Sequence, residues 1–243
     1  CGMRDPIRDE VPSMVQKARK AGYDIVMATG DHKGTGEYVA RETGILYDDY
    51  TIATGTELDA VLADEARWSK TKAFARVTPE DKLQLLRAYH DKGVMIAMTG
   101  DGVNDVPALA GADVAIAMGE SGTDIAQKAA DIVLLDDSFS SIVQGIEEAR
   151  HIFYTIRRVV LYFFSTNAAE IMIILFSVAL NLTLPVYPIQ LLWLNFVSDG
   201  FLDVGLSFEP HEEGLLEHTW LQRAHRGGLF DVRLVWTIMY LAF

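Results

Sequence analysis

The stretch that decides the fold is Val94-Met-Ile-Ala-Met-Thr-Gly-Asp-Gly-Val-Asn-Asp-Val-Pro-Ala108, an apolar run followed by small and acidic residues. The same order occurs earlier, where Asp24-Ile-Val-Met-Ala28 precedes Thr29-Gly30-Asp31. Continuous runs of Val, Ile, Met and Ala are typical of strands that are buried on both faces of a parallel sheet. In open α/β sheets the ligand site lies at the carboxyl ends of the strands. Both tripeptides are therefore candidate site segments.

Working outward from this stretch, strand patterns alternate with helical patterns through the first 138 residues. This alternation predicts a doubly wound α/β domain of the Rossmann type, built on a parallel sheet. The expected strands are 24–28, 72–75, 94–98, 114–118 and 132–135, and the expected helices lie near 8–21, 35–43, 57–66, 79–92, 104–110 and 123–130. Pro79 and Glu80 favour a helix start, because proline is tolerated in the first turn and an acid there complements the helix dipole.

The residues after the two strands have the chemistry of a phosphate and metal site. Glycine lets the backbone approach a ligand closely, a hydroxyl can bind a phosphoryl oxygen, and a carboxylate can hold Mg²⁺. Asp101 and Asp105 lie four residues apart with Asn104 between them, which suits a hard cation; a plain helix cap explains only one of the two acids. Lys82 follows Pro79 on an expected helix, and taken alone it is more typical of a solvated surface.

The second half of the chain has the composition of a membrane region. Residues 1–150 hold 26 acidic and 16 basic side chains, whereas residues 159–208 hold three charged side chains, all acidic. An amphipathic stalk helix is expected over 139–158 and runs without a breaker into 159–182. At about 1.5 Å per residue these 24 residues would span roughly 36 Å, enough to cross a bilayer core of about 30 Å. We expect further membrane segments at 189–208 and from 229 to 243, with a polar linker at 209–228.

The basic residues near the segment ends predict the orientation. Arg150, Arg157 and Arg158 precede the first span, Arg223 and Arg226 lie in the linker, and the turn at 181–188 has no basic residue. By the positive-inside rule, residues 1–158 and the linker face the cytoplasm. The alternative is a pair of buried helices in a large soluble protein, but such helices are usually shorter.

Composition excludes several other classes of protein. The single cysteine, Cys1, excludes an internal disulfide framework and a Cys-based zinc site. The net charge of −13 argues against a nucleic-acid binder. The chain opens without an initiator Met or a signal peptide and ends inside an apolar run, so we interpret it as a fragment of a longer polypeptide.

Four segments together resemble P-type cation-transporting ATPases of the calcium-pump-like branch. They are Thr29-Gly30-Asp31, Phe74-Ala-Arg-Val-Thr-Pro-Glu-Asp-Lys82, Thr99–Ala108 and Gln190-Leu-Leu-Trp-Leu-Asn-Phe-Val-Ser-Asp-Gly200. The resemblance covers essentially the whole chain, from the later part of the phosphorylation domain through the fifth and sixth membrane helices into the seventh.

The resemblance implies a haloacid-dehalogenase-like phosphorylation domain that acts on ATP with Mg²⁺. It implies that Asp101 coordinates Mg²⁺, that Asp105 supports that site, and that Lys82 neutralises charge on the transferred phosphoryl group. The residues that it implies at phosphate or nucleotide are Thr29, Gly30, Asp31, Arg76, Lys82 and Asn104. The family's phosphorylated Asp sits in an Asp-Lys-Thr-Gly-Thr motif that does not occur in this sequence. We therefore expect this chain alone to be inactive.

Acids inside the apolar segments indicate the transported cargo. Glu170 lies mid-span with Asn167 on the same helical face, and Asn195, Ser198, Asp199 and Asp203 share a face of the second segment. A charge at the bilayer centre costs about 2.5–3.5 kcal/mol, so these acids need a partner, and a cation is the natural one. Protonated acids that serve helix packing are the alternative. Gly200 is also expected to let this helix unwind and offer carbonyl oxygens.

The family pattern matches Asn167, Glu170, Asn195, Ser198 and Asp199 as cation ligands, with Asp203 as an additional candidate. Calcium pumps of the family usually carry Thr at the position of Ser198 and Pro shortly after the glycine, and Asp203 is an extra acid. The sequence as a whole predicts part of a multi-pass pump of the plasma membrane, most simply for Ca²⁺. The rival interpretations are a membrane-anchored phosphatase of the same superfamily, a pump for another cation such as a heavy metal, and a truncated regulator.

Overall fold

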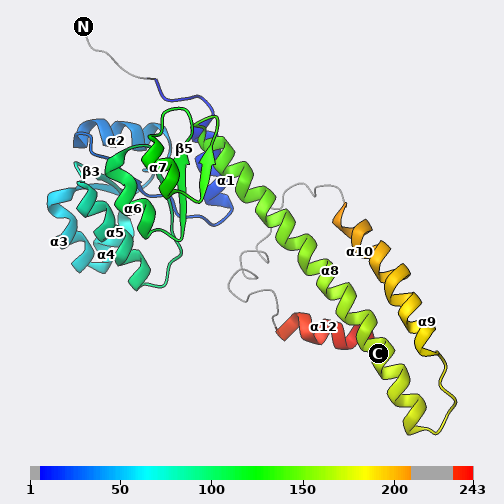
Figure 1. Cartoon of the computed structure of the whole chain (residues 1–243). Helices are drawn as coiled ribbons and strands as arrows, with labels where there is room; N and C mark the ends of the chain where they lie inside the picture. Colours follow the sequence, from blue (N-terminus) through cyan, green and yellow to red (C-terminus); the bar gives the residue numbers. More distant parts are fainter. Residues whose placement is uncertain (1–5, 209–231, 243) are drawn as a thin grey trace. The chain divides into compact units, whose positions relative to one another are not determined.

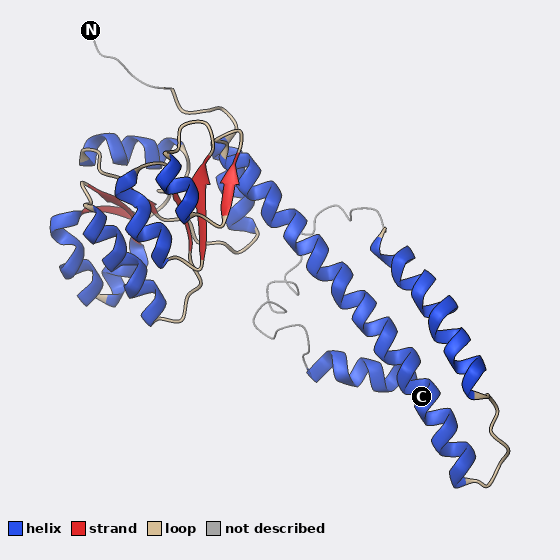
Figure 2. Cartoon of the chain, in the orientation of Figure 1, coloured by secondary structure: helices blue, strands red, loops and turns tan. Residues whose placement is uncertain are grey.

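The computed structural model describes residues 6–208 and 232–242, and the chain divides into two units, one ending at Gly145 and the other beginning at Ile146. The first unit alternates helices and strands (Figures 1 and 2). Its helices are α1 (Val11–Lys20), α2 (Lys33–Glu42), α3 (Leu58–Ala63), α4 (Glu65–Lys70), α5 (Pro79–Asp91), α6 (Val106–Gly111) and α7 (Asp124–Ala129). Its strands are β1 (Met27–Ala28), β2 (Thr51–Thr54), β3 (Thr71–Ala75), β4 (Ala97–Gly100), β5 (Val114–Met118) and β6 (Ile132–Leu134).

The strands are all parallel, as predicted, but they form two sheets and not one. The first sheet has the order β1-β3-β2 and the second has the order β4-β5-β6. In the part of the chain that the structure describes, β1 pairs with β3 and β4 pairs with β5, so no ladder joins the two sheets. Local periodicity predicts a strand but not its neighbour, which is why the sequence could not reveal this division.

The strand β3 is the centre of the first sheet and is buried along its whole length. Its side chains alternate between two clusters, because successive residues of a strand point to opposite faces. Phe74 packs with Leu58, Val61 and other residues of the α3–α5 layer, and Ala73 packs with Ala40 of α2. The prediction of a strand covered on both faces is therefore confirmed for β3.

Several predicted boundaries are wrong, each for a local reason. The strand β2 was not expected at all, and it lies between an acidic loop and a short 3₁₀ turn, Gly55–Glu57. The helix expected over 57–66 is broken at Asp64, whose carboxylate caps α4 by accepting the backbone N–H groups of Ala66 and Arg67 at 3.0 and 3.2 Å. The strand expected over 94–98 begins three residues later and ends at Gly100, because pairing with β5 begins only at Ala97.

The helix α5 begins where the sequence predicts. Thr78 and Asp81 form a reciprocal cap: the Asp81 carboxylate accepts the Thr78 N–H at 2.8 Å, and the Thr78 hydroxyl accepts the Asp81 N–H at 3.2 Å. Pro79 occupies the first turn, where a missing N–H costs nothing. This cap fixes the start of the helix that carries Lys82.

The second unit is helical in its described parts. The helix α8 (Phe139–Ala179) has 41 residues; it runs without a break through position 158, as predicted, and ends three residues before the predicted end at 182. It is the one helix among the described residues that is long and apolar enough to cross a membrane, by length and composition. Next come α9 (Pro188–Trp193), a π-helical segment (Leu194–Asp199), α10 (Gly200–Ser207) and later α12 (Val232–Ala242). The linker predicted at 209–228 lies outside the described residues.

Candidate functional site

The first site segment joins the ends of β1 and β3. The Thr29 N–H donates to the Phe74 carbonyl at 2.8 Å, the Val77 N–H donates to the Thr29 carbonyl at 3.1 Å, and the Arg76 N–H donates to the Asp31 carbonyl at 2.9 Å. The Thr29 hydroxyl in turn accepts the Asp31 N–H at 3.1 Å. These bonds fix Thr29, Gly30 and Asp31 at the carboxyl edge of the first sheet.

Arg76 has an unusual backbone at this edge. Its φ is +51°, in the left-handed region that non-glycine residues seldom adopt. Its guanidinium lies against His32, with Nη2 at 2.9 and 2.7 Å from the two ring nitrogens. Gly55 packs beneath this turn: a Cβ there would lie 2.7 Å from the Arg76 carbonyl oxygen and from the Asp81 carboxylate. The strained turn holds an exposed cation one residue beyond the strand end.

The second site segment contains a partly buried ion pair. Lys82 Nζ lies 2.5 Å from Asp105 Oδ1, and the two side chains are 16 % and 10 % exposed. The other carboxylate oxygen of Asp105 faces the backbone N–H groups of Asp101 and Gly102 at 3.4 Å. An added Cβ at Gly100 would lie 2.5 Å from the Asp105 Cβ, so only glycine permits this approach. The loop after β4 therefore wraps around Asp105.

Asp101 and Asn104 are exposed beside this pair. Among the described residues, no group of three or more His, Cys, Asp or Glu side chains is arranged to hold a metal ion. Mg²⁺ does not need such a group, because it usually binds one or two carboxylates together with phosphate oxygens and water. A free carboxylate at a strand end, next to a carboxylate that a lysine holds in place, fits that requirement.

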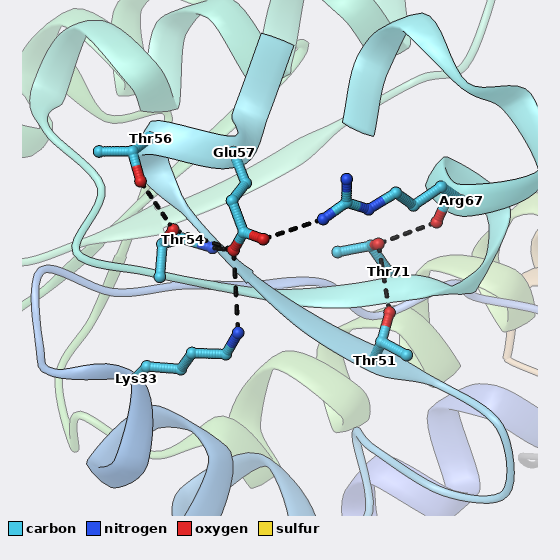
Figure 3. A network of polar contacts seen from close by, with 7 residues as sticks. All are labelled: Lys33, Thr51, Thr54, Thr56, Glu57, Arg67 and Thr71. Atoms are coloured by element: carbon cyan, nitrogen blue, oxygen red, sulfur yellow. Dashed lines mark hydrogen bonds and ion pairs between the residues drawn. The ribbon is translucent and has the colours of Figure 1, made fainter. Parts of the chain in front are cut away.

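A polar network that sequence reasoning missed connects the turn after β2 to α2 and α4 (Figure 3). The Glu57 carboxylate accepts the N–H and the hydroxyl of Thr54 at 2.9 and 3.0 Å and meets Arg67 Nη2 at 2.9 Å. Lys33, the first residue of α2, approaches the same carboxylate at 3.8 Å. The bonds from the backbone and the hydroxyl of Thr54 lower the pKa of Glu57 below its usual 4.5. Thr54 followed by Glu57 is a capping-box spacing, a signal that could have revealed the turn.

The structure therefore places the predicted catalytic and phosphate-binding residues in two clusters. One contains Thr29, Gly30, Asp31 and Arg76, and the other contains Lys82, Asp101, Asn104 and Asp105. A short segment of chain connects the two clusters. Arg76, of the first cluster, follows β3, and Lys82, of the second cluster, lies in the first turns of α5, the next helix.

In the second unit the structure brings two predicted cation ligands together. Asn195 Nδ2, in the π-helical segment, lies 3.4 Å from Glu170 Oε2 of α8. Asn167 instead donates to the Phe163 carbonyl of its own helix at 2.7 Å. The side chains of Ser198 and Asp199 lie outside the described set, and Asp203 is a half-buried residue of α10.

The expected unwinding at Gly200 is wrong. Gly200 has helical angles, with φ −60° and ψ −43°, and it begins α10. The irregularity lies just before it, in the π-helical turns Leu194–Asp199. A π-helical segment bonds one residue further along than an α-helix and is frequent at functional sites.

Two protein-family descriptions match parts of the chain. Residues 1–113 match the haloacid dehalogenase-like hydrolase family, and residues 183–243 match the family described as Cation transporting ATPase, C-terminus. A solved zinc-transporting PIB-type ATPase in the E2·Pi state aligns with a TM-score of 0.58 and 26 % identity, covering 84 % of this chain and 27 % of the other. The predicted haloacid-dehalogenase-like fold is confirmed.

Individual relatives indicate the branch of the family more closely than the family descriptions do. The chain is 42 % identical to calcium-transporting ATPase 1 of Bacillus cereus, with 89 % of this chain and 24 % of the relative aligned. It is 38 % identical to the calcium-transporting ATPase of Bacillus subtilis (100 % and 27 %) and 40 % identical to the endoplasmic reticulum calcium ATPase srcA of Aspergillus fumigatus (93 % and 23 %). The resemblance to P-type cation-transporting ATPases of the calcium-pump-like branch is thus confirmed, and the chain spans about a quarter of the length of these relatives.

Proposed function

We propose that this chain is part of an ATP-driven P-type cation pump, in which ATP hydrolysis through an aspartyl-phosphate drives transport of a cation. Ca²⁺ is the cation that we favour. The observation that carries the proposal is the ion pair of Lys82 and Asp105 next to Asp101, at the carboxyl end of β4. Phosphoryl transfer depends mainly on positioning and charge neutralisation, and this arrangement offers both.

Each residue of the two clusters has a role in this proposal. Asp105 holds the Lys82 ammonium in place, and Lys82 neutralises charge on the transferred phosphoryl group. Asp101 would hold Mg²⁺, which would supply further neutralisation of phosphate charge when bound. The residues that contact phosphate or nucleotide are Thr29, Gly30, Asp31, Arg76 and Asn104.

The proposed cation site lies in the second unit. Glu170 and Asn195, 3.4 Å apart, would provide carboxylate and amide oxygens, the ligands that Ca²⁺ prefers. Asn167, Ser198 and Asp199 would complete the site, and Asp203 remains an accessory candidate. The names of the bacterial and fungal relatives favour Ca²⁺.

The proposal also includes the membrane in which the chain lies and its orientation there. The lipid bilayer is the partner of the exposed apolar side chains of α8, and residues 1–158 face the cytoplasm. We propose that this bilayer is the plasma membrane, because two of the aligned relatives are bacterial.

The test is Asp101→Asn in the full-length protein. This substitution keeps the size of the side chain and removes the charge, so Mg²⁺-dependent phosphoenzyme formation from ATP should disappear. Asp91→Asn, at the exposed end of α5, is the matched control and should behave as the wild type. Wild-type phosphoenzyme in Asp101→Asn would contradict the proposed role.

The rival functions make different predictions. A membrane-anchored phosphatase would release phosphate without any cation dependence, and a truncated regulator would form no phosphoenzyme at all. A heavy-metal pump would be activated by Zn²⁺ and not by Ca²⁺. The match of residues 183–243 to the cation-ATPase family supports the transport interpretation over the phosphatase.

A further inference from the structure

Asp137 binds a backbone loop that follows β5. Its Oδ1 accepts the N–H groups of Gly119 and Glu120 at 2.7 and 3.1 Å, and its Oδ2 accepts the N–H of Ser121 at 2.7 Å. The bond from the Ser121 side chain, together with these backbone bonds, lowers the pKa of Asp137 below its usual 3.8. Asp137 also has a left-handed backbone, with φ at +49°. One carboxylate thus holds three consecutive residues.

The opposite side of the same loop is held by Gln127 of α7. Its Nε2 approaches the carbonyls of Met118, Gly119 and Gly122 at 3.2, 2.9 and 3.2 Å. A Cβ at Gly122 would lie 2.0 Å from the Met118 carbonyl oxygen, so the loop packs as tightly as its backbone allows. The loop is therefore held on both sides, its N–H groups by Asp137 and its carbonyls by Gln127.

This loop reaches the site already described. The N–H of Thr123, the residue after Gly122, donates to the carbonyl of Asp101 at 2.9 Å. A shift of the loop therefore moves the backbone of the residue proposed to hold Mg²⁺. Asp137 therefore reaches Asp101 through the loop, by its bonds to the N–H groups of residues 119–121.

Asp137 also lies two residues before the start of α8. Arg8 Nη1 donates to the Asp137 carbonyl at 2.9 Å, and the Ser138 hydroxyl donates to Glu10 at 2.6 Å, which anchors the junction to the N-terminal part of the domain. From Phe139 the helix continues without interruption to Ala179 and carries Glu170.

We propose that Asp137 is a positioning residue that couples the start of α8 to the loop 119–123 and, through it, to Asp101. The proposal rests on the proposed function, since it gives that function its link between the cation-binding helix and the phosphoryl site. A displacement of the helix start moves Asp137, and the three N–H bonds transmit the movement to the loop.

The chain supplies a matched control at the neighbouring position. Asp136 has the same charge as Asp137 and also lies just before the start of α8. Its carboxylate, however, accepts the Ser141 hydroxyl at 2.5 Å and the Ser138 N–H at 3.2 Å. It therefore caps α8, whereas Asp137 binds the loop. Ser121→Ala is a milder variant, because it removes the hydroxyl that lowers the pKa of Asp137 and keeps the Asp137 carboxylate and the Ser121 N–H that binds it.

The experiment measures phosphoenzyme formed from radiolabelled ATP by the full-length protein, with saturating Ca²⁺ and with a chelator. The ratio of the two levels does not depend on the fraction of active molecules, so a loss of folded protein does not change it. Coupling between sites typically changes an equilibrium by about 5- to 150-fold. We expect Asp137→Asn to lower the ratio at least about fivefold, Ser121→Ala to lower it less, and Asp136→Asn to keep it. Hydrogen exchange of residues 119–121 should be faster in Asp137→Asn, faster by a smaller factor in Ser121→Ala, and unchanged in Asp136→Asn.

The outcomes separate the two proposals. A wild-type ratio in both Asp137→Asn and Ser121→Ala, or an equal loss in Asp136→Asn, overturns the coupling role and leaves the proposed function standing. A wild-type protein whose phosphoenzyme does not depend on Ca²⁺ overturns the proposed function and the coupling role with it. If Asp137→Asn does not fold, Ser121→Ala decides: a lowered ratio supports the coupling role, and an unchanged ratio overturns it.

Discussion

Replacing Lys82 by methionine tests whether the ion pair with Asp105 organises the loop after β4. Lys82 Nζ and Asp105 Oδ1 are 2.5 Å apart, and little of either side chain is exposed. Methionine keeps most of the apolar stem and removes the charge. Asp105 then keeps only the two N–H groups at 3.4 Å, which are long hydrogen bonds.

The magnitude follows from the burial of the pair. An exposed ion pair contributes about 0–1 kcal/mol, whereas breaking a buried pair costs about 3–5 kcal/mol because the remaining charge loses its partner. The Lys82–Asp105 pair lies near the buried limit, so we expect Lys82→Met to lower the opening free energy of the loop by about 2–4 kcal/mol. The double variant Lys82→Met/Asp105→Asn should lose less than the sum of the single variants, with a coupling of about 1–3 kcal/mol.

Hydrogen exchange of residues 100–105 in the intact protein measures this free energy, because exchange reports local opening. The control is Lys70→Met, which removes a surface pair with Asp49 at 3.8 Å and should cost less than about 1 kcal/mol. Lys82→Met should also slow phosphoryl transfer in a single turnover at least about tenfold, the factor that corresponds to about 1.4 kcal/mol. Additive single variants, or a cost equal to that of Lys70→Met, would refute the reasoning.

Three further predictions concern other parts of the chain. Glu170→Gln should raise the Ca²⁺ concentration that activates ATP hydrolysis while phosphorylation from inorganic phosphate survives, and Asp203→Ala should have a smaller effect; the reverse order in a Ca²⁺ titration would place the cation site elsewhere. Bonds from Thr54 lower the pKa of Glu57 in the folded state, so ionised Glu57 stabilises the fold fully above pH 4.5. This stabilisation is lost as the pH falls through the lowered pKa, and Glu57→Gln should therefore flatten the acid limb of a pH–stability curve. Gly55→Ala should destabilise the first unit by about 1–3 kcal/mol, because its Cβ would lie 2.7 Å from two oxygen atoms, and an unchanged melting temperature would contradict this.

The sequence by itself determined the features that depend on neighbouring residues. It predicted the parallel α/β domain, the start of α5 at Pro79 and the uninterrupted helix from Phe139. It also indicated the candidate site residues, because Thr29-Gly30-Asp31 and Thr99–Ala108 place small and acidic residues at strand ends. Runs, caps and helical spacing are local properties of the chain, so a reader of the sequence can recognise them.

The tertiary structure decided which of these residues meet. It paired Lys82 with Asp105 across 23 positions, placed Asn195 next to Glu170 across 25, and set Asp137 on the loop after β5. It also divided the strands into two sheets and added β2, whose four residues, Thr51–Thr54, are too few to show a periodic pattern. Contacts of this kind depend on how separate elements pack, and since no periodicity along the chain encodes that packing, only the folded structure could reveal them.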